Sequence, residues 1–506
     1  MFVWIHGGSF KDGSAIEYNG ELIASLKKHI VVIPQYRMGL QGFFQSNNGL
    51  WDVRTALEWV NSEISKFGGD PENVHICGES AGAAISSFQL NYDAVQKATG
   101  KKQMFQKVTT MSGAGNAGWS RWNSWQASLG LRVTHDFLKA AEVGYDTVLR
   151  KFGSYTVESI TEFLKTLPDD KLIELSQKSQ GFLISKLGAV MDLIPDLMNI
   201  FSAVIDNEFV FENDKKLDYS GYEVTYGMIN GDGILFQLFM PMAKEAKQNC
   251  KRSMLSKQFY KSIENSKFPE QVIIELYEKG LTEENVLNCV TSRNKLWTEE
   301  TGDLKAFVYS DHMNSETFKQ HPQANIPIEH QMLTRVVTDD KFTIPMLENM
   351  IKVRESGGSV RAYELQHGMK AFGPKYNKMF SDPKTGQCAV ESFWENGYNI
   401  HGDDMCFLFG VLLGEPICKE GKSMKEWGLD AAEYEMTVNF MDFVFGEEKF
   451  SVKIEGVDKL SLECTIFDVD GETRDVADFR RKELEMKNIL IPNVETAAQK
   501  SRRVNL

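Results

Sequence analysis

The stretch Gly78-Glu79-Ser80-Ala81-Gly82 decides how this chain of 506 residues is interpreted. It follows the apolar run 74–77 and precedes the small-residue run 83–87, a pattern that predicts a strand, a sharp turn and a helix. The two glycines let the strand and the helix approach closely, and the turn exposes the serine Oγ at the end of a sheet. Because such a pentapeptide also occurs by chance, its flanks must decide whether Ser80 is a nucleophile.

A second glycine motif, His6-Gly7-Gly8, follows a predicted strand at residues 1–5. Backbone N–H groups of such a loop, together with the N–H that follows a nucleophilic serine, form an oxyanion hole in some esterases. The candidate donors are therefore Gly7, Gly8 and Ala81. The alternative is that the two glycines only form a tight turn after the strand.

These motifs belong to a longer series that resembles the type-B carboxylesterases, the family that also contains the cholinesterases. The resemblance implies an α/β-hydrolase, with a mostly parallel central sheet flanked by helices, and a serine esterase with a triad of serine, acid and histidine. The matching segments keep the family's order and spacing through the first quarter of the chain: 6–10 (HGGSF), 36–43, 48–52, 56–60, 67–71 (FGGDP), 78–82 and 111–113, followed by Trp119.

The acid of such a triad is expected after a strand downstream of the serine. Residues 224–229 have the pattern of a strand, and Asn230-Gly231-Asp232-Gly233 follows as a turn. The family usually has glutamate at the position of Asp232, whose side chain is shorter and carries the same charge. Asp-Gly is also a common structural turn, so the assignment depends on the position after a strand.

His401 is the candidate base among nine histidines, because it leads into Phe407-Leu408-Phe409-Gly410 and so resembles the family's histidine loop. His6 belongs to the glycine loop, His75 falls in a predicted strand, and the other six lack a comparable setting. We expect Ser80 to attack an ester and His401 to act as general base and then general acid. Asp232 would hold the imidazole and stabilise its charged form.

The resemblance places two further residues near this chemistry. Glu79 corresponds to a residue that lines the substrate gorge in the family, although it could also be a buried hydrogen-bonding group. Trp119 matches the region of the acyl pocket. No metal-binding or cofactor-binding motif is visible, so we expect neither a metal nor a cofactor. The second hypothesis for the whole chain is an inactive cholinesterase-like adhesion or binding protein, which the retention of all three triad residues disfavours.

The sequence predicts one α/β-hydrolase domain over residues 1–506, without a linker or repeat. Helical gorge or cap insertions are expected at about 119–220 and 235–355, with solvated helices at 242–300, and a short polar tail at about 493–506. The strands are expected at 1–5, 29–37, 74–79, 105–112, 223–230 and 359–366. At the C-terminus we expect strands near 450–454 and 460–466, and a helix at about 474–490.

Composition restricts the partners. The chain is 42% hydrophobic and 25% charged, as in ordinary globular proteins, and its net charge of −14 argues against nucleic acid and anionic membranes. The apolar run 187–205 is interrupted by Asp192, Pro195 and Asp196, so no membrane span is expected. The expected partner is a small ester, and the oligomeric state is left open.

The family's N-terminal edge strands are lacking, because Met1 already falls inside the first matching strand. A truncated gene model or isoform, or a protein that tolerates the loss, would explain this. Seven cysteines leave at least one unpaired thiol. Without a signal peptide, the chain as given is expected to be cytoplasmic, whereas a full-length form could be secreted or lumenal in the endoplasmic reticulum.

Overall fold

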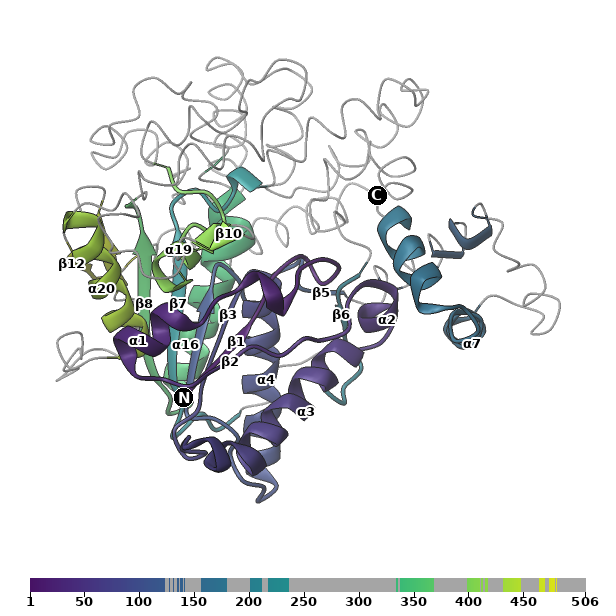
Figure 1. Ribbon diagram of the computed structural model, residues 1–506, viewed down its shortest axis with the longest axis horizontal. Helices are drawn as coiled ribbons and strands as arrows, with labels where there is room; N and C mark the ends of the chain where they lie inside the picture. Colours follow the sequence, from purple (N-terminus) through teal and green to yellow (C-terminus); the bar gives the residue numbers. More distant parts are fainter. Residues whose placement is uncertain are drawn as a thin grey trace, which may run out of the picture.

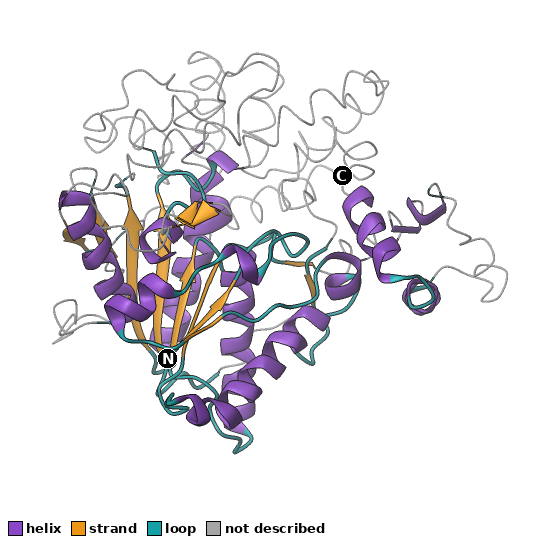
Figure 2. Cartoon of the chain, viewed as in Figure 1, coloured by secondary structure: helices purple, strands orange, loops and turns teal. Residues whose placement is uncertain are grey.

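The computed structural model of the chain has an eight-stranded sheet with helices on both faces (Figure 1; Figure 2). It describes residues 1–122, 156–179, 201–211, 217–235, 337–367, 398–409, 431–446, 464–468 and 473–477, with a few single residues and pairs between these ranges. The strands of the sheet are β1 (Phe2–Ile5), β2 (Val31–Val32), β3 (His75–Glu79), β4 (Lys107–Met111), β7 (Glu223–Ile229), β8 (Ser359–Leu365), β11 (Cys464–Phe467) and β12 (Thr473–Val476).

The strand order is β12-β11-β8-β7-β4-β3-β1-β2, and every neighbouring pair is parallel except β11 with β12. This confirms the predicted mostly parallel sheet and its six predicted strands, although β2 is only two residues long. Because the parallel strands all end at the same edge, the loops that follow β1, β3, β7 and β8 meet there.

Strand β1 shows how the sequence builds two apolar layers. Phe2 and Trp4 pack into one hydrophobic cluster, whereas Val3 and Ile5 pack into the other. This alternation is the two-residue period of a strand. All four side chains are fully buried, as expected for a parallel strand covered on both faces.

Helices cover the two faces of the sheet. On the side of Val3 lie α3 (Asn48–Glu63), α4 (Ala81–Ala98) and α16 (Ile344–Glu355), and on the side of Phe2 lie α1 (Glu21–Lys27), α19 (Met405–Phe409) and α20 (Ala431–Phe445). Among the described helices, none is both long and apolar enough to cross a membrane. The remaining elements are α2 (Gly39–Phe43), α7 (Val157–Leu164), β5 (Arg121–Trp122), β6 (Ala203–Val204), β9 (Val411–Leu412), β10 (Glu415–Pro416) and short helical turns at Ala15–Glu17, Ile64–Phe67 and Asp339–Thr343.

Two sequence predictions are wrong where they meet described residues. The helix predicted from residue 474 begins instead as strand β12, which is antiparallel to β11 and joined to it by a 2.6 Å bond from Thr465 Oγ1 to Asp475 Oδ1. This strand is exposed and charged at the sheet edge, so it lacks the alternating apolar pattern of a strand. The helical insertion predicted at about 119–220 contains two short strands, β5 and β6, which pair with each other. The predictions for 187–200, 242–300 and 450–454 lie outside the described residues.

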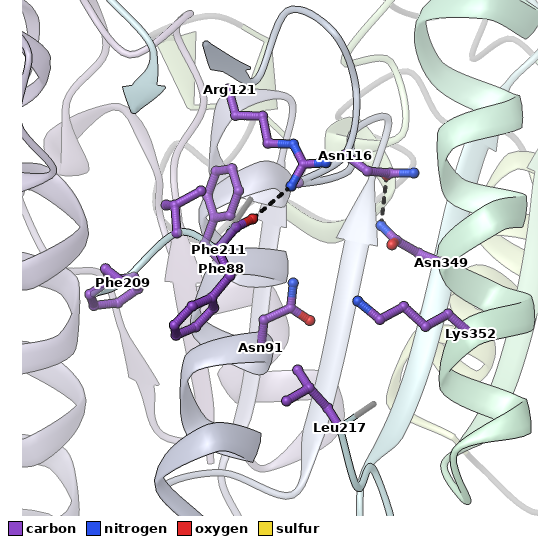
Figure 3. A pocket seen from close by; sticks show the side chains of 11 residues that line it. Phe88, Asn91, Asn116, Arg121, Phe209, Phe211, Leu217, Asn349 and Lys352 are labelled. Carbon is purple, nitrogen blue, oxygen red and sulfur yellow. Dashed lines mark hydrogen bonds between the residues drawn. The ribbon is translucent and has the colours of Figure 1, made fainter. Parts of the chain in front are cut away.

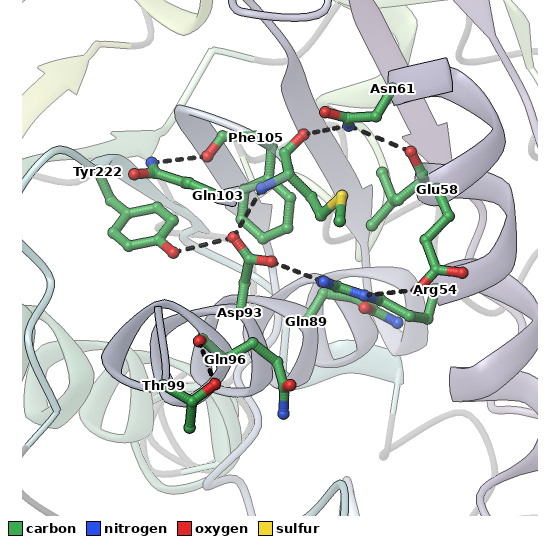
Figure 4. Close-up of polar contacts among 12 residues, drawn as sticks. Arg54, Glu58, Asn61, Gln89, Asp93, Gln96, Thr99, Gln103, Phe105 and Tyr222 are labelled. Carbon is green, nitrogen blue, oxygen red and sulfur yellow. Dashed lines mark hydrogen bonds and ion pairs between the residues drawn. The ribbon is translucent and has the colours of Figure 1, made fainter. Parts of the chain in front are cut away.

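A buried ion pair joins α3 to α4 (Figure 4). Arg54 Nη1 donates to Asp93 Oδ1 at 2.6 Å, and both side chains are almost fully buried. The other carboxylate oxygen, Oδ2, accepts from the Met104 N–H at 3.0 Å and from the Tyr222 hydroxyl at 2.9 Å. Asp93 therefore connects two helices with the chain segments at the start of β4 and β7.

We expect Asp93→Asn to lower the free energy of unfolding by about 3–5 kcal/mol, because the buried Arg54 guanidinium would lose its close counter-charge and keep only the exposed Glu58 carboxylate at 3.6 Å. Urea denaturation followed by circular dichroism measures this loss. The matched control is Glu63→Gln, which removes the partner of Lys66 from an exposed pair and should change the value by less than about 1 kcal/mol. Equal effects of the two substitutions would contradict the stronger contribution of the buried pair.

Candidate active site

The candidate nucleophile, Ser80, lies in the turn between β3 and α4. Its φ of 56° is in the left-handed region, which residues other than glycine seldom adopt. A Cβ on Gly78 would lie 2.3 Å from the Gly82 carbonyl oxygen, and a Cβ on Gly82 would lie 2.0 Å from the Ile5 carbonyl oxygen. Only glycine therefore fits at both positions, and the turn has the form of a nucleophile elbow.

The loop that follows β1 lies against this elbow. A Cβ on Gly7 would lie 3.1 Å from Ser80 Cβ, and Gly8 has a φ of 108°, a conformation that favours glycine. Within the described part of the chain, the N–H groups of Gly8 and Ala81 donate no backbone hydrogen bond, and the Gly7 N–H contacts the Tyr18 hydroxyl. The available N–H groups of Gly8 and Ala81 beside the elbow are consistent with the predicted oxyanion hole.

Asp232 and His401 are 169 positions apart in the sequence and in direct contact in the structure. His401 Nδ1 lies 2.7 Å from Asp232 Oδ1. Asp232 is fully buried, and its Oδ2 accepts from the Ile229 N–H at 3.1 Å, which fixes the carboxylate at the end of β7. Because Nδ1 is bonded to the carboxylate, Nε2 is the ring nitrogen that can exchange a proton.

Two asparagines that the sequence analysis did not single out dock the histidine loop onto the Asp232 turn. The Asn399 N–H donates to Asn230 Oδ1 at 2.9 Å, and Asn399 Nδ2 donates to the Leu365 carbonyl oxygen at 3.2 Å. The turn approaches so closely that a Cβ on Gly231 would lie 2.0 Å from the Asn399 carbonyl oxygen. Each asparagine lies two residues before a predicted triad member, and that placement is the only sequence signal that could have identified them.

Glu79 lies on the opposite side of the imidazole from Asp232. Its Oε1 is 3.2 Å from His401 Nε2, without the alignment of a hydrogen bond. Among the described residues, neither His401 Nε2 nor Ser80 Oγ has a hydrogen-bond partner. Catalytic hydrogen bonds are often long or misaligned without substrate, so this arrangement is compatible with a resting active site.

The three groups change one another's ionisation. Burial lowers the pKa of His401, but the negative charges of Glu79 and Asp232 raise it more, to about 9. Burial raises the pKa of Glu79 to about 7, since the opposing effect of His401 is smaller and Asp232 adds to the rise. Glu79 is therefore close to half-ionised near neutral pH, whereas the imidazole is held in its charged form.

Asp404 is a further carboxyl group behind the histidine, and the sequence analysis did not assign it a role. It is fully buried, and the Tyr363 hydroxyl donates to its Oδ2 at 2.8 Å. Burial raises its pKa well above the usual range, and the charges of Glu79 and Asp232 raise it further. The consecutive acids that follow His401-Gly402 were the available sequence signal.

The ring of Phe342 lies near both Trp119 and the imidazole of His401. Its Nε1 donates to the Lys341 carbonyl oxygen at 2.8 Å, and its ring lies 5.8 Å from that of Phe342. The Phe342 ring in turn lies 4.9 Å from the imidazole of His401. Trp119 is half-buried, so the structure places it beside the site without direct contact with the imidazole.

Other reactive groups are less suited to the chemistry. The described cysteines, Cys77, Cys406 and Cys464, are buried free thiols, and burial raises the pKa of each, so none is activated as a thiolate. Within the described residues, no group of three His, Cys, Asp or Glu side chains could hold a metal ion. Ser80 remains the candidate nucleophile.

Comparison with known proteins matches residues 1–449 to the model of the Carboxylesterase family. Carboxylesterase 5A of Homo sapiens is 35% identical over 190 residues, which are 36% of this chain and 30% of that protein. Acetylcholinesterase of Gallus gallus is 37% identical over 130 residues, 24% of this chain and 16% of that protein. Cocaine esterase of Homo sapiens is 46% identical over 99 residues, 18% of each. The aligned segments thus span less than a third of each relative.

We expect Glu79→Gln to lower the pKa of His401 from about 9 toward the ordinary histidine range, because the substitution removes a negative charge that stabilises the imidazolium. Nuclear magnetic resonance titration of labelled histidines measures the shift, with the His401 signal assigned from its absence in His401→Gln. The control, Glu158→Gln, changes an exposed glutamate and should leave that pKa unchanged. An unchanged His401 pKa in Glu79→Gln would contradict the electrostatic role of Glu79.

Proposed function

Because the chain belongs to the carboxylesterase family, we propose that it hydrolyses carboxylic esters through an acyl-enzyme on Ser80. The main support is the 2.7 Å contact between His401 Nδ1 and the buried Asp232 carboxylate. This contact leaves Nε2 as the proton acceptor, on the side of the imidazole where Glu79, the residue before the serine, lies 3.2 Å away. The family's usual glutamate is replaced by aspartate, which makes the same type of bond.

In the proposed first step, Ser80 Oγ attacks the ester carbonyl carbon while His401 Nε2 accepts the hydroxyl proton. The N–H groups of Gly7, Gly8 and Ala81 then stabilise the negative oxygen of the tetrahedral intermediate. One such donor typically contributes about 3 kcal/mol to lowering the barrier. His401 returns the proton to the alcohol oxygen as the carbon–oxygen bond breaks, which leaves the acyl group on Ser80.

The second half-reaction repeats the proton transfers with water. His401 Nε2 accepts a proton from water, the resulting hydroxide attacks the acyl carbon, and Ser80 Oγ leaves with the proton from the imidazolium. His401 must be neutral at the start of both steps, and its pKa of about 9 therefore predicts activity that increases with pH. Protonation of Glu79, whose pKa is about 7, would remove a negative charge beside the imidazole and so lower the pKa of His401. Burial of Glu79 against substrate would favour that protonation.

We expect Ser80→Ala to abolish hydrolysis of a short-acyl nitrophenyl ester and to abolish labelling by a fluorophosphonate probe. The alanine removes the only atom that would form the covalent bond, and its methyl group fills the same turn. Release of nitrophenol and fluorescence of the labelled band measure the two effects. The control, Ser62→Ala, changes an exposed serine on α3 whose hydroxyl donates to the Trp59 carbonyl oxygen at 3.1 Å.

Activity or labelling that survives in Ser80→Ala would refute Ser80 as the nucleophile. A wild-type protein that is folded by circular dichroism yet is neither labelled nor active would instead support the inactive, binding-protein hypothesis. The probe needs no knowledge of the natural ester, so it separates these outcomes from a poor choice of substrate.

We expect Asp232→Asn to lower kcat by about 10⁴-fold, because an amide at this position favours the wrong imidazole tautomer and cannot stabilise the imidazolium. The isosteric change keeps the shape of the turn. The same nitrophenyl ester assay measures the loss, and a thermal midpoint close to the wild-type value shows that the fold is retained. A loss of less than about tenfold would exclude Asp232 as the triad acid.

A further inference from the structure

The segment that leads into α16 contacts the candidate active site at several points. It consists of Thr338 and the π-helical turn Asp339–Thr343, and α16 follows directly at Ile344. In this turn the Ile344 N–H donates to the Asp339 carbonyl oxygen, five residues earlier, whereas a regular α-helix forms its bonds over four residues. Single π-helical turns are rare and are frequent at functional sites.

Pro345 explains why a carbonyl group of this turn accepts a bond from another element. An α-helical bond to the Lys341 carbonyl oxygen would come from the N–H of residue 345, and proline has no N–H. Trp119 Nε1 donates to that oxygen at 2.8 Å. This bond joins the π-helical turn to the loop after β4, the loop on which Trp119 lies.

Two further bonds attach α16 to the same loop. Asn349 Nδ2 donates to Asn116 Oδ1 at 2.8 Å (Figure 3), and Asn116 Nδ2 donates to Glu348 Oε2 at 2.8 Å. Strand β4 lies between β3 and β7 in the sheet, and these two strands lead to Ser80 and Asp232. The π-helical turn is therefore fixed to the part of the sheet that carries the candidate nucleophile and the candidate acid.

The same turn packs against the candidate base. The Phe342 side chain is almost fully buried, and its ring centre lies 4.9 Å from that of the His401 imidazole. Because interiors are closely packed, a ring at this distance restricts rotation of the imidazole. The turn thus helps to hold His401 in the orientation in which Nδ1 meets Asp232.

Thr338 contacts the turn that carries the candidate acid. Its Oγ1 accepts from the Gly233 N–H at 2.9 Å, and the threonine is almost fully buried. Gly233 directly follows Asp232. The two segments approach so closely that a Cβ on Gly233 would lie 2.6 Å from the Thr334 carbonyl oxygen. Since a buried N–H without an acceptor is unfavourable, loss of the hydroxyl would displace the Asp232 turn.

The Thr338 bond complements the anchor between Asn230 and Asn399. That anchor holds the turn before Asp232, whereas Thr338 holds it after Asp232. The carboxylate is thereby restrained from both sides at 2.7 Å from His401 Nδ1. Such restraint matters because a displacement of about 1 Å near a reacting group can lower the rate on the order of 100-fold.

We propose that Thr338 is a positioning residue for the Asp232–His401 pair. Its hydroxyl acts through the Gly233 N–H and holds the carboxylate against the imidazole. The proposal rests on the proposed role of this pair in ester hydrolysis. The geometry that it assigns to the pair can nevertheless be measured without catalysis.

Thr338→Val replaces the accepting hydroxyl by a methyl group, and Thr338→Ala removes it without placing a methyl group against the Gly233 N–H. We expect each to lower kcat for the nitrophenyl ester by about tenfold or more, with an equal fall in kcat/KM, since the bond acts on the transition state. Thr338→Ser keeps the hydroxyl and should retain most of the activity. The control, Thr465→Val, removes the hydroxyl that bonds to Asp475 on the far side of β8 and should leave kcat unchanged.

Proton magnetic resonance measures the geometry of the pair without substrate. The His401 Nδ1 proton, bonded to a buried carboxylate, should give a signal downfield of the other N–H protons, and Asp232→Asn identifies the signal by removing it. We expect this signal to move upfield in Thr338→Val and Thr338→Ala and to keep its position in Thr338→Ser and Thr465→Val.

An unchanged signal together with an unchanged kcat in folded Thr338→Ala would overturn the proposal. A wild-type protein that gives the downfield signal but hydrolyses no ester would count against the reaction at Ser80. In that case an upfield shift in the Thr338 variants would still support the positioning of the pair by Thr338, so the two failures are distinguishable.

Discussion

The close approach of helix α4 to strand β1 is the constraint on which the candidate active site depends. A side chain on Gly82 would collide with the Ile5 carbonyl oxygen, 2.0 Å away, so this position must be glycine. The approach puts Ser80 and the Ala81 N–H beside the loop that follows β1, where the Gly8 N–H donates no backbone hydrogen bond among the described residues. The candidate nucleophile and the candidate oxyanion donors are thus brought together by backbone packing before any side chain contributes.

Three acidic side chains, Asp232, Glu79 and Asp404, raise the pKa of the His401 imidazole. Asp232 contacts Nδ1 and Glu79 faces Nε2, while Asp404 adds charge from behind the ring. The acids cannot all be ionised without mutual repulsion in a poorly solvated site, so burial raises the pKa of Glu79 and of Asp404. Each rise in pKa favours the protonated form of that carboxyl group, which lowers the repulsion among the acids around His401.

The sequence alone predicted the structure correctly where short local patterns carry structural information. Strands such as 74–79 and 223–230, the Ser80 turn and the Asp232–His401 contact all followed from apolar runs, glycines and family spacing. The sequence alone did not predict the features that depend on tertiary contacts. Strand β12 is charged and exposed, and only its pairing with β11 makes it a strand. The roles of Asn230 and Asn399 depend on a contact across the fold, which no local pattern encodes.

That contact also explains how the acid and the histidine stay together across 169 positions of sequence. The entropic cost of closing a loop rises by only about 0.6 kcal/mol for each doubling of its length. A long intervening segment is therefore tolerated as long as its two ends are anchored. The Asn230–Asn399 bond and the close packing of Gly231 against the Asn399 carbonyl group provide that anchor within two residues of both side chains. The geometry of the pair thus depends on this anchor, together with strand β8, which lies between the two residues in the sequence and pairs with β7.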